Sequence, residues 1–144
     1  NAVIGGESSG GLAVRGHIAG KDGIYAAALL VEMLAVTGKS VSQLYQEITD
    51  KYGMLYYEDA AFTMTQARKA ELQEKLFVKL EVPDFGNAVE KINRTDGCKV
   101  YFTDGSWVIC RFSGTEPLLR MAAEGESQSQ ARTYIRIWRE ALGL

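Results

Sequence analysis

Apolar positions near the start of the chain predict a strand, a loop and a helix. Residues 2–6 form a short apolar run typical of a buried strand, and the run leads into a glycine-rich loop at residues 5–11. Residues 24–36 are apolar almost all round, which predicts a deeply buried helix. Asp22 stands where the N-cap of that helix belongs, and Gly38 stands where the helix should end.

A second helix is predicted directly afterwards. Ser40 and Gln43 have the spacing of a capping box, and Gly53 is a C-terminal stop. Between them the apolar and aromatic residues recur at helical spacing: Val41, Leu44, Tyr45, Ile48 and Tyr52. A strand, a loop and two helices in this order predict that residues 1–53 are the end of an α/β unit.

The pattern changes at residue 54, and residues 54–75 are expected to be a connector. Its first part, residues 54–63, has an extended character, and residues 66–75 form a charged helix of weak amphipathicity. A second unit is expected to begin at residue 76. Residues 77–82 alternate like a strand as far as Pro83, whereas residues 88–93 are compatible with either strand or helix.

A hairpin, a further strand and a last helix complete the second unit. The hairpin strands are residues 98–103 and 106–112, joined at Asp104-Gly105, which is a type I′ turn signal. Residues 118–124 form the next strand. Ser127 and Gln130 form a capping box before a helix with the apolar stripe Ala131, Tyr134, Ile135, Trp138 and Leu142. Strands followed by a helix predict an α+β unit, an antiparallel sheet with helices on one face.

Composition narrows the classes of function. The chain has 144 residues, enough for one ordinary domain or two small units. Its formal net charge of −2 argues against nucleic-acid binding by a broad basic field, so any anion site must be local. The longest apolar stretch is interrupted by Glu32 and is too short to span a bilayer, so no membrane partner is expected. Because the chain begins with Asn1 and not with Met, we expect it to be part of a longer protein.

The two cysteines, Cys98 and Cys110, lie on the two strands of the predicted hairpin. With a type I′ turn, Phe102 faces Trp107, and the two cysteines then point to opposite faces. They are therefore expected to remain unbridged, and free thiols fit a reducing compartment.

The loop Gly-Gly-Glu-Ser-Ser-Gly-Gly at residues 5–11 allows three interpretations. It is a glycine-rich turn, or a G-x-S-x-G nucleophile elbow of a serine esterase, or a site for sugar hydroxyls. An elbow must lead into a helix and needs a histidine well downstream, but the only histidine is His17. In the sugar interpretation, Glu7 accepts hydroxyl hydrogen bonds and Ser9 donates or accepts one.

Two further stretches carry groups that suit chemistry on a phosphorylated ligand. His17 and Lys21 precede the apolar helix, and burial at its N-terminal mouth would suit a general acid or base, although both residues are also ordinary surface types. The stretch RFSGTEPLLR, residues 111–120, combines hydroxyls and a glycine with Arg111 and Arg120, each able to hold phosphate through a bidentate fork. It is either a polar turn or a phosphate site in which Glu116 faces away and orders an arginine.

These stretches resemble one family. GGESSGG, GHIAGKDGI and TDGCKVYFTDGSWVICRFSGTEPLLR, in that order, resemble the C-terminal part of the α-D-phosphohexomutases, the phosphoglucomutase/phosphomannomutase superfamily. The resemblance implies that residues 1–53 are the end of domain three and residues 54–75 a linker with a helix. Residues 76–144 are then domain four, similar to a TATA-box-binding-protein-like sheet with helices on one face.

The resemblance also implies roles for single residues. Glu7 and Ser9 would bind sugar hydroxyls, and Lys21, with His17, would approach the reacting phosphate. The phosphate that does not react would be held by Arg111, Ser113, Gly114, Thr115 and Arg120. Some members have histidine where this chain has Gly11, so an acid/base role of that histidine would be absent or would shift to Lys21 or His17.

By this resemblance the whole protein would be a cytoplasmic enzyme that interconverts hexose 1-phosphate and hexose 6-phosphate, an intramolecular phosphotransferase. A phosphoserine and a hexose 1,6-bisphosphate intermediate carry the phosphoryl group, and Mg²⁺ assists. The phosphoserine loop and the D-G-D-G-D magnesium loop, which belong to domains one and two, are not in this sequence. The residues present form no metal-ligand cluster. We therefore expect this chain to bind the phosphorylated hexose and to be inactive alone.

The substrate is expected to be glucose phosphate because G-H-x-x-x-K-D-G looks most like phosphoglucomutases. A phosphomannomutase or a phosphoglucosamine mutase is the alternative parent. A module that binds phosphorylated ligands without being part of an enzyme is a further alternative, as is the serine esterase.

Overall fold

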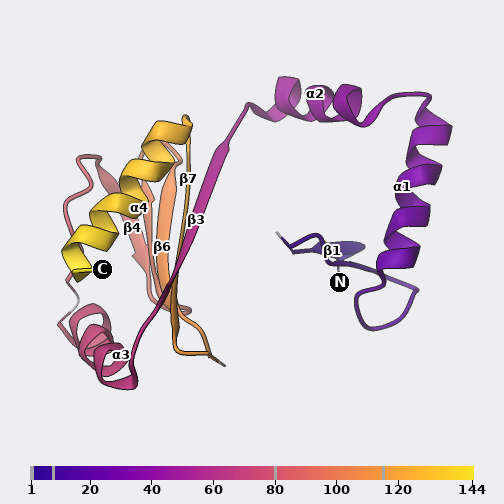
Figure 1. Ribbon diagram of the computed structural model, residues 1–144. Helices are drawn as coiled ribbons and strands as arrows, with labels where there is room; N and C mark the ends of the chain where they lie inside the picture. The colour runs from indigo at the N-terminus through magenta and orange to yellow at the C-terminus, as the bar shows by residue number, and fades with distance from the viewer. Residues whose placement is uncertain (1, 8, 80, 115) are drawn as a thin grey trace. The chain divides into compact units, whose positions relative to one another are not determined.

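The computed structural model describes residues 2–7, 9–79, 81–114 and 116–144, and they fall into two compact units. The first unit is Asn1–Gly53 and the second is Met54–Leu144. Figure 1 shows the elements of each unit along the chain.

The first unit contains a two-stranded antiparallel ribbon and two helices. The ribbon pairs β1 (Ile4–Gly6) with β2 (Leu12–Val14), and α1 (Gly23–Thr37) and α2 (Val41–Tyr52) follow. All of the predicted helix caps are confirmed. Asp22 Oδ1 accepts from the Ile24 and Tyr25 amides, both at 3.0 Å, and Ser40 with Gln43 forms the capping box.

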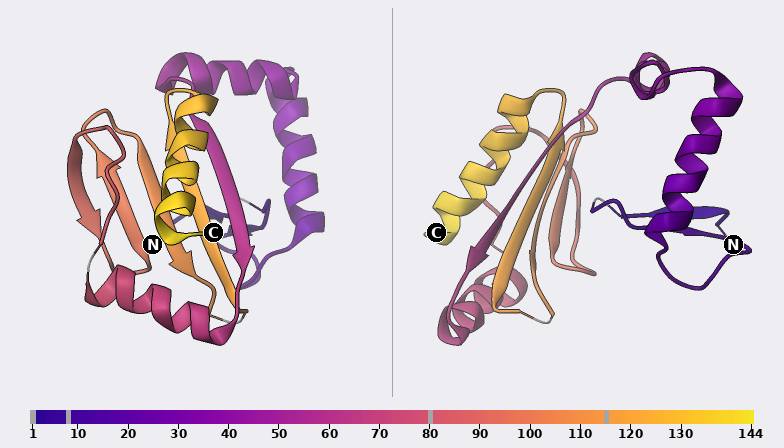
Figure 2. Two further views of the ribbon diagram at one scale, coloured as in Figure 1. Left: turned by 60° about the vertical axis from the view of Figure 1, so that its left-hand side comes forward. Right: turned by 45° about the vertical axis from the view of Figure 1, so that its right-hand side comes forward.

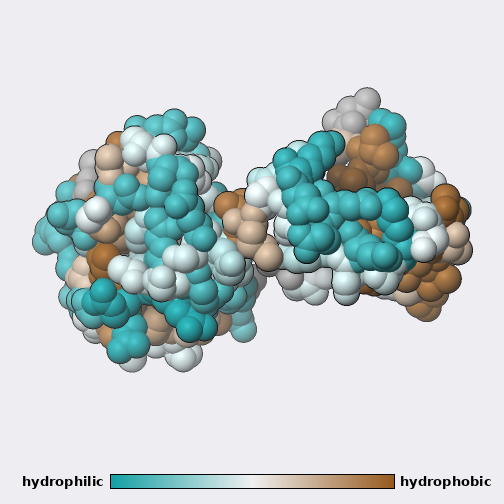
Figure 3. Space-filling model, turned by 90° about the horizontal axis from the view of Figure 1, so that it is seen from above, coloured by the Kyte–Doolittle hydropathy of each residue, from teal (hydrophilic) through white to brown (hydrophobic). Residues whose placement is uncertain are grey.

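The expectation that residues 2–6 and 24–36 are buried is wrong for the residues described here. All three residues of β1 are exposed, and α1 has no buried residue; Ile24 keeps 87% of its surface and Val36 keeps 80%. A two-stranded ribbon with three residues in each strand offers too little surface to cover an apolar helix. Apolar side chains therefore lie open on this unit, the right-hand part of Figure 3. Among the described residues no single helix is long and apolar enough to cross a bilayer, and α1 with α2 reaches that length only across an 81° bend.

The second unit is built on a five-stranded antiparallel sheet in the order β3-β7-β6-β5-β4. The strands are β3 (Tyr56–Thr63), β4 (Val89–Asn93), β5 (Cys98–Phe102), β6 (Trp107–Phe112) and β7 (Leu118–Gly125). Figure 2 shows α4 (Gln128–Leu142) along one face of the sheet, with α3 (Gln66–Gln73) at one end on the same side. The predicted sheet with helices on one face is confirmed.

The core of the second unit lies between the sheet and these helices. Trp138 and Tyr134 of α4 and Leu72 of α3 are buried against alternate residues of the three central strands. Residues one position away on the same strands therefore point to the open face of the sheet. This alternation decides which side chains are available to a ligand.

Two predictions about the start of the second unit need correction. The expected connector, residues 54–75, contains β3, which pairs with β7 along its whole length and is an edge strand of the sheet. Its acidic residues are tolerated because an edge strand is only half buried. The described part of the expected strand, residues 77–79 and 81–82, is not extended into a strand. Leu72 and Leu76 are both buried one helical turn apart, and α3 continues into the π-helical turn η1 (Glu74–Val78). Residues 88–93, left open between strand and helix, contain β4.

The register of the hairpin also differs from the prediction. The Phe102 amide donates to the Ser106 carbonyl, and Gly105 has a φ of 86°, so the turn is a three-residue loop with a glycine bulge. Trp107 consequently faces Tyr101 and not Phe102, and Cys98 lies directly opposite Cys110. The two cysteines are thus on the same, buried face, contrary to prediction. Both are free thiols, as expected.

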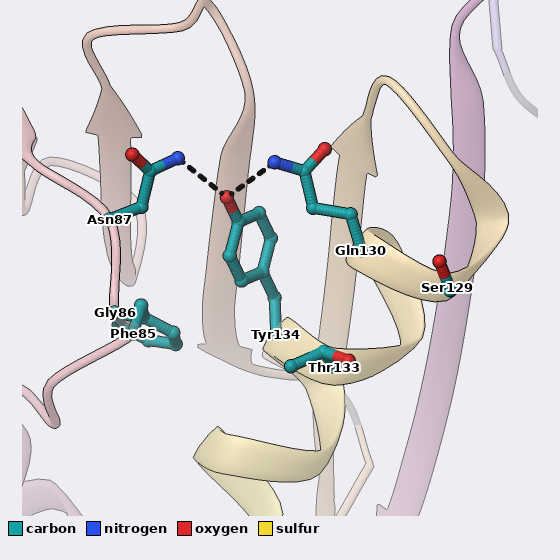
Figure 4. A pocket seen from close by; sticks show the side chains of 7 residues that line it. All are labelled: Phe85, Gly86, Asn87, Ser129, Gln130, Thr133 and Tyr134. Carbon is teal, nitrogen blue, oxygen red and sulfur yellow. Dashed lines mark hydrogen bonds between the residues drawn. The ribbon is translucent and has the colours of Figure 1, made fainter.

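A hydrogen-bonded cluster fastens this turn to α4. The Tyr134 hydroxyl accepts from Asn87 Nδ2 and from Gln130 Nε2, each at 3.0 Å (Figure 4). With both donors in place, its own proton is directed to Ser106 Oγ at 2.9 Å, and Ser106 in turn donates to Asp104 Oδ1 at 2.5 Å. Asn87, Gln130 and Tyr134 line a hollow of about 330 Å³. The polar groups of the cluster satisfy one another, so we assign the cluster a structural role.

Candidate functional site

Two arginines face each other across the centre of the sheet. Arg111 on β6 is the register partner of Arg120 on β7. Their neighbours Cys110, Leu119 and Met121 are buried in the core, so both arginines point to the open face. Like charges directly opposite each other in a sheet are destabilising, so this pair is expected where a negative charge is to be bound.

Each arginine is held by one carboxylate. Arg111 Nη1 lies 3.0 Å from Asp96 Oδ2, and Arg120 Nη2 lies 3.4 Å from Glu116 Oε2. As predicted, Glu116 orders an arginine. A guanidinium has five N–H donors, so each arginine retains donors for a ligand. Both side chains remain about half exposed, at 44% for Arg111 and 51% for Arg120.

Three carbonyl oxygens at the turn between β6 and β7 accept hydrogen bonds. The Leu118 carbonyl accepts from the Ser113 amide at 2.8 Å, and the Glu116 carbonyl accepts from the Leu118 amide at 2.8 Å. The Pro117 carbonyl accepts from the Met64 amide, which lies just before α3, at 3.0 Å. Carbonyl oxygens that are already hydrogen bonded repel an incoming anion less, so the turn presents mainly donors.

Ser113 and Gly114 supply those donors. Ser113 Oγ accepts from the Glu116 amide at 3.3 Å, which leaves the hydroxyl proton for a ligand. The exposed Gly114 amide has no acceptor among the described residues, and a Cβ at Gly114 would meet nothing within 4 Å. Thr115, also predicted to bind phosphate, lies outside the described residues.

Sequence reasoning missed Lys69 of α3. Its Nζ donates to the Ser113 carbonyl at 3.2 Å and lies 5.9 Å from the centroid of the Phe112 ring. Lys69 is 44 residues from Ser113 in the sequence, so no local motif could connect the two.

A second group of predicted residues meets in the first unit. Lys21 Nζ lies 2.5 Å from Glu7 Oε2, and Ser9 Oγ donates to the same oxygen at 3.3 Å. The hydrogen bond and charge of Lys21 lower the pKa of Glu7, and Ser9 adds to this effect. Glu7 Oε1 has no partner among the described residues, so it can accept a hydroxyl.

Gly11 makes the Glu7–Lys21 pair possible. A Cβ at position 11 would lie 2.6 Å from Lys21 Cδ and 3.2 Å from Cε, so the lysine stem occupies the space that any other side chain would need. The burial expected of Lys21 is not found, since its side chain is 56% exposed.

His17 lies at the N-terminus of α1, as expected, where it contacts the helix cap. Its Nε2 is 2.9 Å from Asp22 Oδ2, and its ring stacks on Tyr25 at 4.0 Å between centroids. The hydrogen bond from His17 and the amides of Tyr25 and Ile24 lower the pKa of Asp22. His17 therefore holds the loop that carries Lys21. Among the described residues it forms no hydrogen bond or ring contact with Glu7 or Lys21.

The fold contradicts the serine esterase interpretation of the loop at residues 5–11. A nucleophile elbow runs from a strand into a helix, whereas this loop runs from β1 into β2. Ser8, the nucleophile it would need, lies outside the described residues. Within the described ranges, no group of three or more His, Cys, Asp or Glu side chains is arranged to hold a metal ion, so we assign no magnesium ligands to them.

Comparison with known proteins matches both units. The family model for "Phosphoglucomutase/phosphomannomutase, alpha/beta/alpha domain III" matches residues 1–52, and that for the "Phosphoglucomutase/phosphomannomutase, C-terminal domain" matches residues 63–139. Each matched range contains one of the two residue groups described above.

Curated relatives agree with the family models. A phosphoglucomutase/phosphomannomutase of Thermococcus kodakarensis is 34% identical over 95% of this chain and 28% of its own length. A probable phosphoglucosamine mutase of Methanosarcina acetivorans is 37% identical over 88% of this chain and 26% of its own. The chain thus spans about a quarter of the length of these relatives.

Solved structures agree on the fold. A phosphoglucomutase/phosphomannomutase family protein from Burkholderia thailandensis covers 98% of this chain, with 28% of its own length matched, a TM-score of 0.68 and 22% identity. Paramecium pp63/parafusin, a phosphoglucomutase in its open form, also covers 98% with 30% of its own length matched, a TM-score of 0.70 and 23% identity. With family models matched on each side of the boundary between the units, the chain belongs to the phosphoglucomutase/phosphomannomutase family.

Proposed function

We propose that this chain provides the sugar and phosphate contacts of a phosphohexomutase that interconverts hexose 1-phosphate and hexose 6-phosphate. The observation that carries the proposal is the Arg111–Arg120 register pair. It lies beside a turn in which several carbonyls already accept hydrogen bonds, while the Gly114 amide has no acceptor among the described residues. Two guanidinium groups, a hydroxyl and a backbone amide are the groups that bind a phosphate dianion tightly and in a fixed orientation.

The clamp has a role in orientation and none in bond breaking. It would hold the phosphate that is not transferred, so that the other end of the sugar meets the reacting phosphoryl group. Positioning and charge neutralisation account for most catalysis of phosphoryl transfer, so a clamp of this kind serves such a reaction directly. Thr115 belongs to the clamp by the family resemblance.

The first unit would contact the sugar ring. Glu7 Oε1 is available to accept a hydroxyl, while Oε2 is held by Lys21 and Ser9. Lys21 would act near the reacting phosphate as the acid/base group, and His17 would act by holding its loop through Asp22. A sugar hydroxyl that binds at Glu7 would lie close to the Lys21 ammonium. That positive charge suits a sugar that also carries a phosphate.

The proposal for the whole protein includes groups that this sequence does not contain. The phosphoserine and the Mg²⁺ site would come from domains one and two, and a hexose 1,6-bisphosphate would be the intermediate. The described residues offer no cluster for a metal, so no step here depends on one. The chain alone should bind substrate and show no turnover. We place the enzyme in the cytoplasm.

Glucose phosphate is our first choice of substrate because of the G-H-x-x-x-K-D-G stretch at residues 16–23. Glucosamine phosphate is the second choice, since several relatives are described as probable phosphoglucosamine mutases, including one 37% identical to this chain. Mannose phosphate is the third. Comparing the affinities of the three 6-phosphates for the same chain decides among them.

Nuclear magnetic resonance of the ¹⁵N-labelled chain tests the clamp. Glucose 6-phosphate is added in steps and amide shifts are followed. We expect saturable shifts at Ser113, Gly114 and neighbouring amides, reproduced in part by inorganic phosphate and not by glucose. If no amide of residues 111–120 moves at any soluble concentration, the phosphate clamp is refuted. The alternative of a binding module without an enzyme is decided by the reading frame upstream of Asn1.

A further inference from the structure

Lys69 differs from the arginines of the clamp in what it contacts. Arg111 and Arg120 each pair with a carboxylate, whereas Lys69 has no carboxylate partner among the described residues. Its ammonium donates instead to the carbonyl of Ser113 at 3.2 Å. The side chain is half-buried beside the Phe112 ring, so its charge is screened less than that of a fully exposed lysine.

The start of α3 holds Lys69 in this position. Thr65 caps the helix, with its Oγ1 accepting from the Arg68 amide at 3.2 Å, and its carbonyl accepts from the Lys69 amide at 2.9 Å. One residue earlier, the Met64 amide donates to the Pro117 carbonyl. The segment that positions Lys69 is therefore itself fastened to the turn between β6 and β7. The Lys69 ammonium and the segment before α3 thus contact the turn at two points, the Ser113 and Pro117 carbonyls.

The contact acts on a particular peptide group. The carbonyl of Ser113 and the amide N–H of Gly114 belong to the same planar peptide unit. A cation on the oxygen polarises that unit and makes its N–H a stronger donor, since hydrogen bonds in a chain reinforce one another. That N–H is the open donor of the clamp. Lys69 also neutralises the oxygen that would otherwise present negative charge near the bound anion.

We propose that Lys69 is a positioning residue of the phosphate clamp, acting through the Ser113–Gly114 peptide. It fixes the orientation of that peptide, strengthens the Gly114 donor and supplies a positive charge that is paired with no carboxylate among the residues that the structure describes. The inference rests on the proposed function, because it assumes that the turn binds a phosphorylated ligand. It does not require Lys69 to touch that ligand.

The experiment compares four versions of the chain: unaltered, Lys69→Met, Lys69→Arg and Lys79→Met. Methionine keeps the stem and removes the charge. Lys79 is a matched control, because it is an exposed lysine paired with Glu74 and is not part of the clamp. Affinity for glucose 6-phosphate and for inorganic phosphate is measured at constant ionic strength, and thermal unfolding shows whether each variant folds.

The first measurement is made without ligand. Lys69→Met should shift the Ser113 ¹³C carbonyl and the Gly114 ¹⁵N resonances more than those of any residue outside α3, and Lys79→Met should leave both in place. Arginine also donates, so Lys69→Arg should return both resonances toward their original positions. If Lys69→Met leaves the two resonances unmoved, the contact does not exist in solution and the inference is overturned.

The second measurement is affinity. Lys69→Met should weaken phosphate binding about three- to tenfold, the range expected for one charge-assisted contact that is partly screened. Lys69→Arg should restore most of the loss, and Lys79→Met should change affinity less than about twofold. Equal affinity for the unaltered chain and Lys69→Met overturns the inference and leaves the clamp standing.

A failure of the proposed function itself would give a different experimental result. If the unaltered chain binds neither ligand, the clamp is refuted and with it the role of Lys69 in anion binding, whatever the resonances show. If Lys69→Met does not fold, Lys69→Gln takes its place, because glutamine can still donate to the carbonyl but has no charge. An affinity unchanged in Lys69→Gln refutes the electrostatic part of the inference.

Discussion

Arg111 and Arg120 are direct partners in the register of β6 and β7, on the face of the sheet that α4 does not cover. Neither is placed there by the needs of folding, because two like charges opposite each other weaken a sheet. Their carboxylate partners, Asp96 and Glu116, offset the repulsion only in part since both ion pairs are solvent-exposed. The pair is best explained as a binding device.

Loss of one arginine should therefore separate binding from stability. Arg120→Gln is expected to weaken glucose 6-phosphate binding at least tenfold, because a bidentate contact to phosphate is lost. Its free energy of unfolding should change by no more than about 0.5 kcal/mol, since a repulsion is removed together with an exposed ion pair. Titration calorimetry and urea unfolding measure the two quantities.

Arg136→Gln is the matched control for that variant. Arg136 lies on the outer part of α4 in an exposed pair with Glu140, so it carries the same charge at a site with no role in the clamp. It should bind phosphate like the unaltered chain. Equal losses of affinity in Arg120→Gln and Arg136→Gln would mean that only net charge matters, which would contradict a specific clamp.

The path of Lys21 over Gly11 gives a second prediction. In Gly11→Ala the new methyl group would lie 2.6 Å from Lys21 Cδ, closer than two carbon atoms can approach, so the lysine must move and the Glu7–Lys21 pair should open. The pKa of Glu7, lowered chiefly by the hydrogen bond from Lys21, should rise toward its ordinary value. Carboxyl ¹³C shifts followed against pH measure it.

Gly20→Ala is the control for this prediction, because a Cβ at Gly20 meets nothing within 4 Å. It should leave the titration of Glu7 unchanged, and Lys21→Met should reproduce the effect of Gly11→Ala. A Glu7 pKa that stays low in Lys21→Met would show that the lysine is not its cause.

Local features of this fold could be predicted from the sequence, and features that depend on a partner far along the chain could not. The caps at Asp22 and Ser40 involve residues within one helical turn, and both are present. At the last helix Ser127 caps as expected, but the Gln130 side chain accepts from Glu126 in place of Ser127. The contact of Lys69 with Ser113 is a product of packing and has no local signal.

The hairpin shows how much can depend on one residue of a turn. Asp104-Gly105 is a signal both for a two-residue loop and for a three-residue loop with a glycine bulge. The structure has the second, with the bulge at Gly105, and the shift of one residue moves the two cysteines onto one face. Gly105 can be recognised as a turn residue from the sequence, whereas the length of the loop, which fixes the register, cannot.

That register gives a third prediction, on thiol reactivity. Burial raises the pKa of Cys98, and burial together with the neighbouring Cys98 raises the pKa of Cys110, so neither thiol forms the reactive thiolate near neutral pH. The folded chain should therefore react with a disulfide reagent far more slowly than free cysteine, and in urea both thiols should react at the rate of free cysteine. A fast reaction of one thiol in the folded chain would contradict the buried position of that residue.

The cluster around Tyr134 predicts how stability depends on a single hydroxyl. In Tyr134→Phe the side-chain amides of Asn87 and Gln130 each lose one acceptor and keep their hydrogen bond to Asp104 Oδ2. Ser106, which is 4% exposed, loses one partner and keeps Asp104 Oδ1. The loss of these hydrogen bonds should lower the free energy of unfolding by about 1–2 kcal/mol. Urea unfolding measures the change. Tyr101→Phe on the open face should have little effect, because the Tyr101 hydroxyl forms no hydrogen bond with the described residues.

Asp104 should make the same cluster sensitive to acid. Burial raises the pKa of Asp104, but hydrogen bonds from the Ser106 side chain and amide, and then from Asn87 and Gln130, outweigh it, so the pKa is lowered overall. A carboxyl whose pKa is lower in the folded state contributes stability that is full above its unfolded pKa of about 3.9 and is lost as pH falls through the folded value. Stability should therefore decline below about pH 4 more steeply in the unaltered chain than in Asp104→Asn, which has no carboxyl to protonate.

Urea unfolding at a series of pH values measures the two slopes, with Asp59→Asn on β3 as the control. Parallel slopes for the unaltered chain and Asp104→Asn would show that the carboxylate does not stabilise the turn.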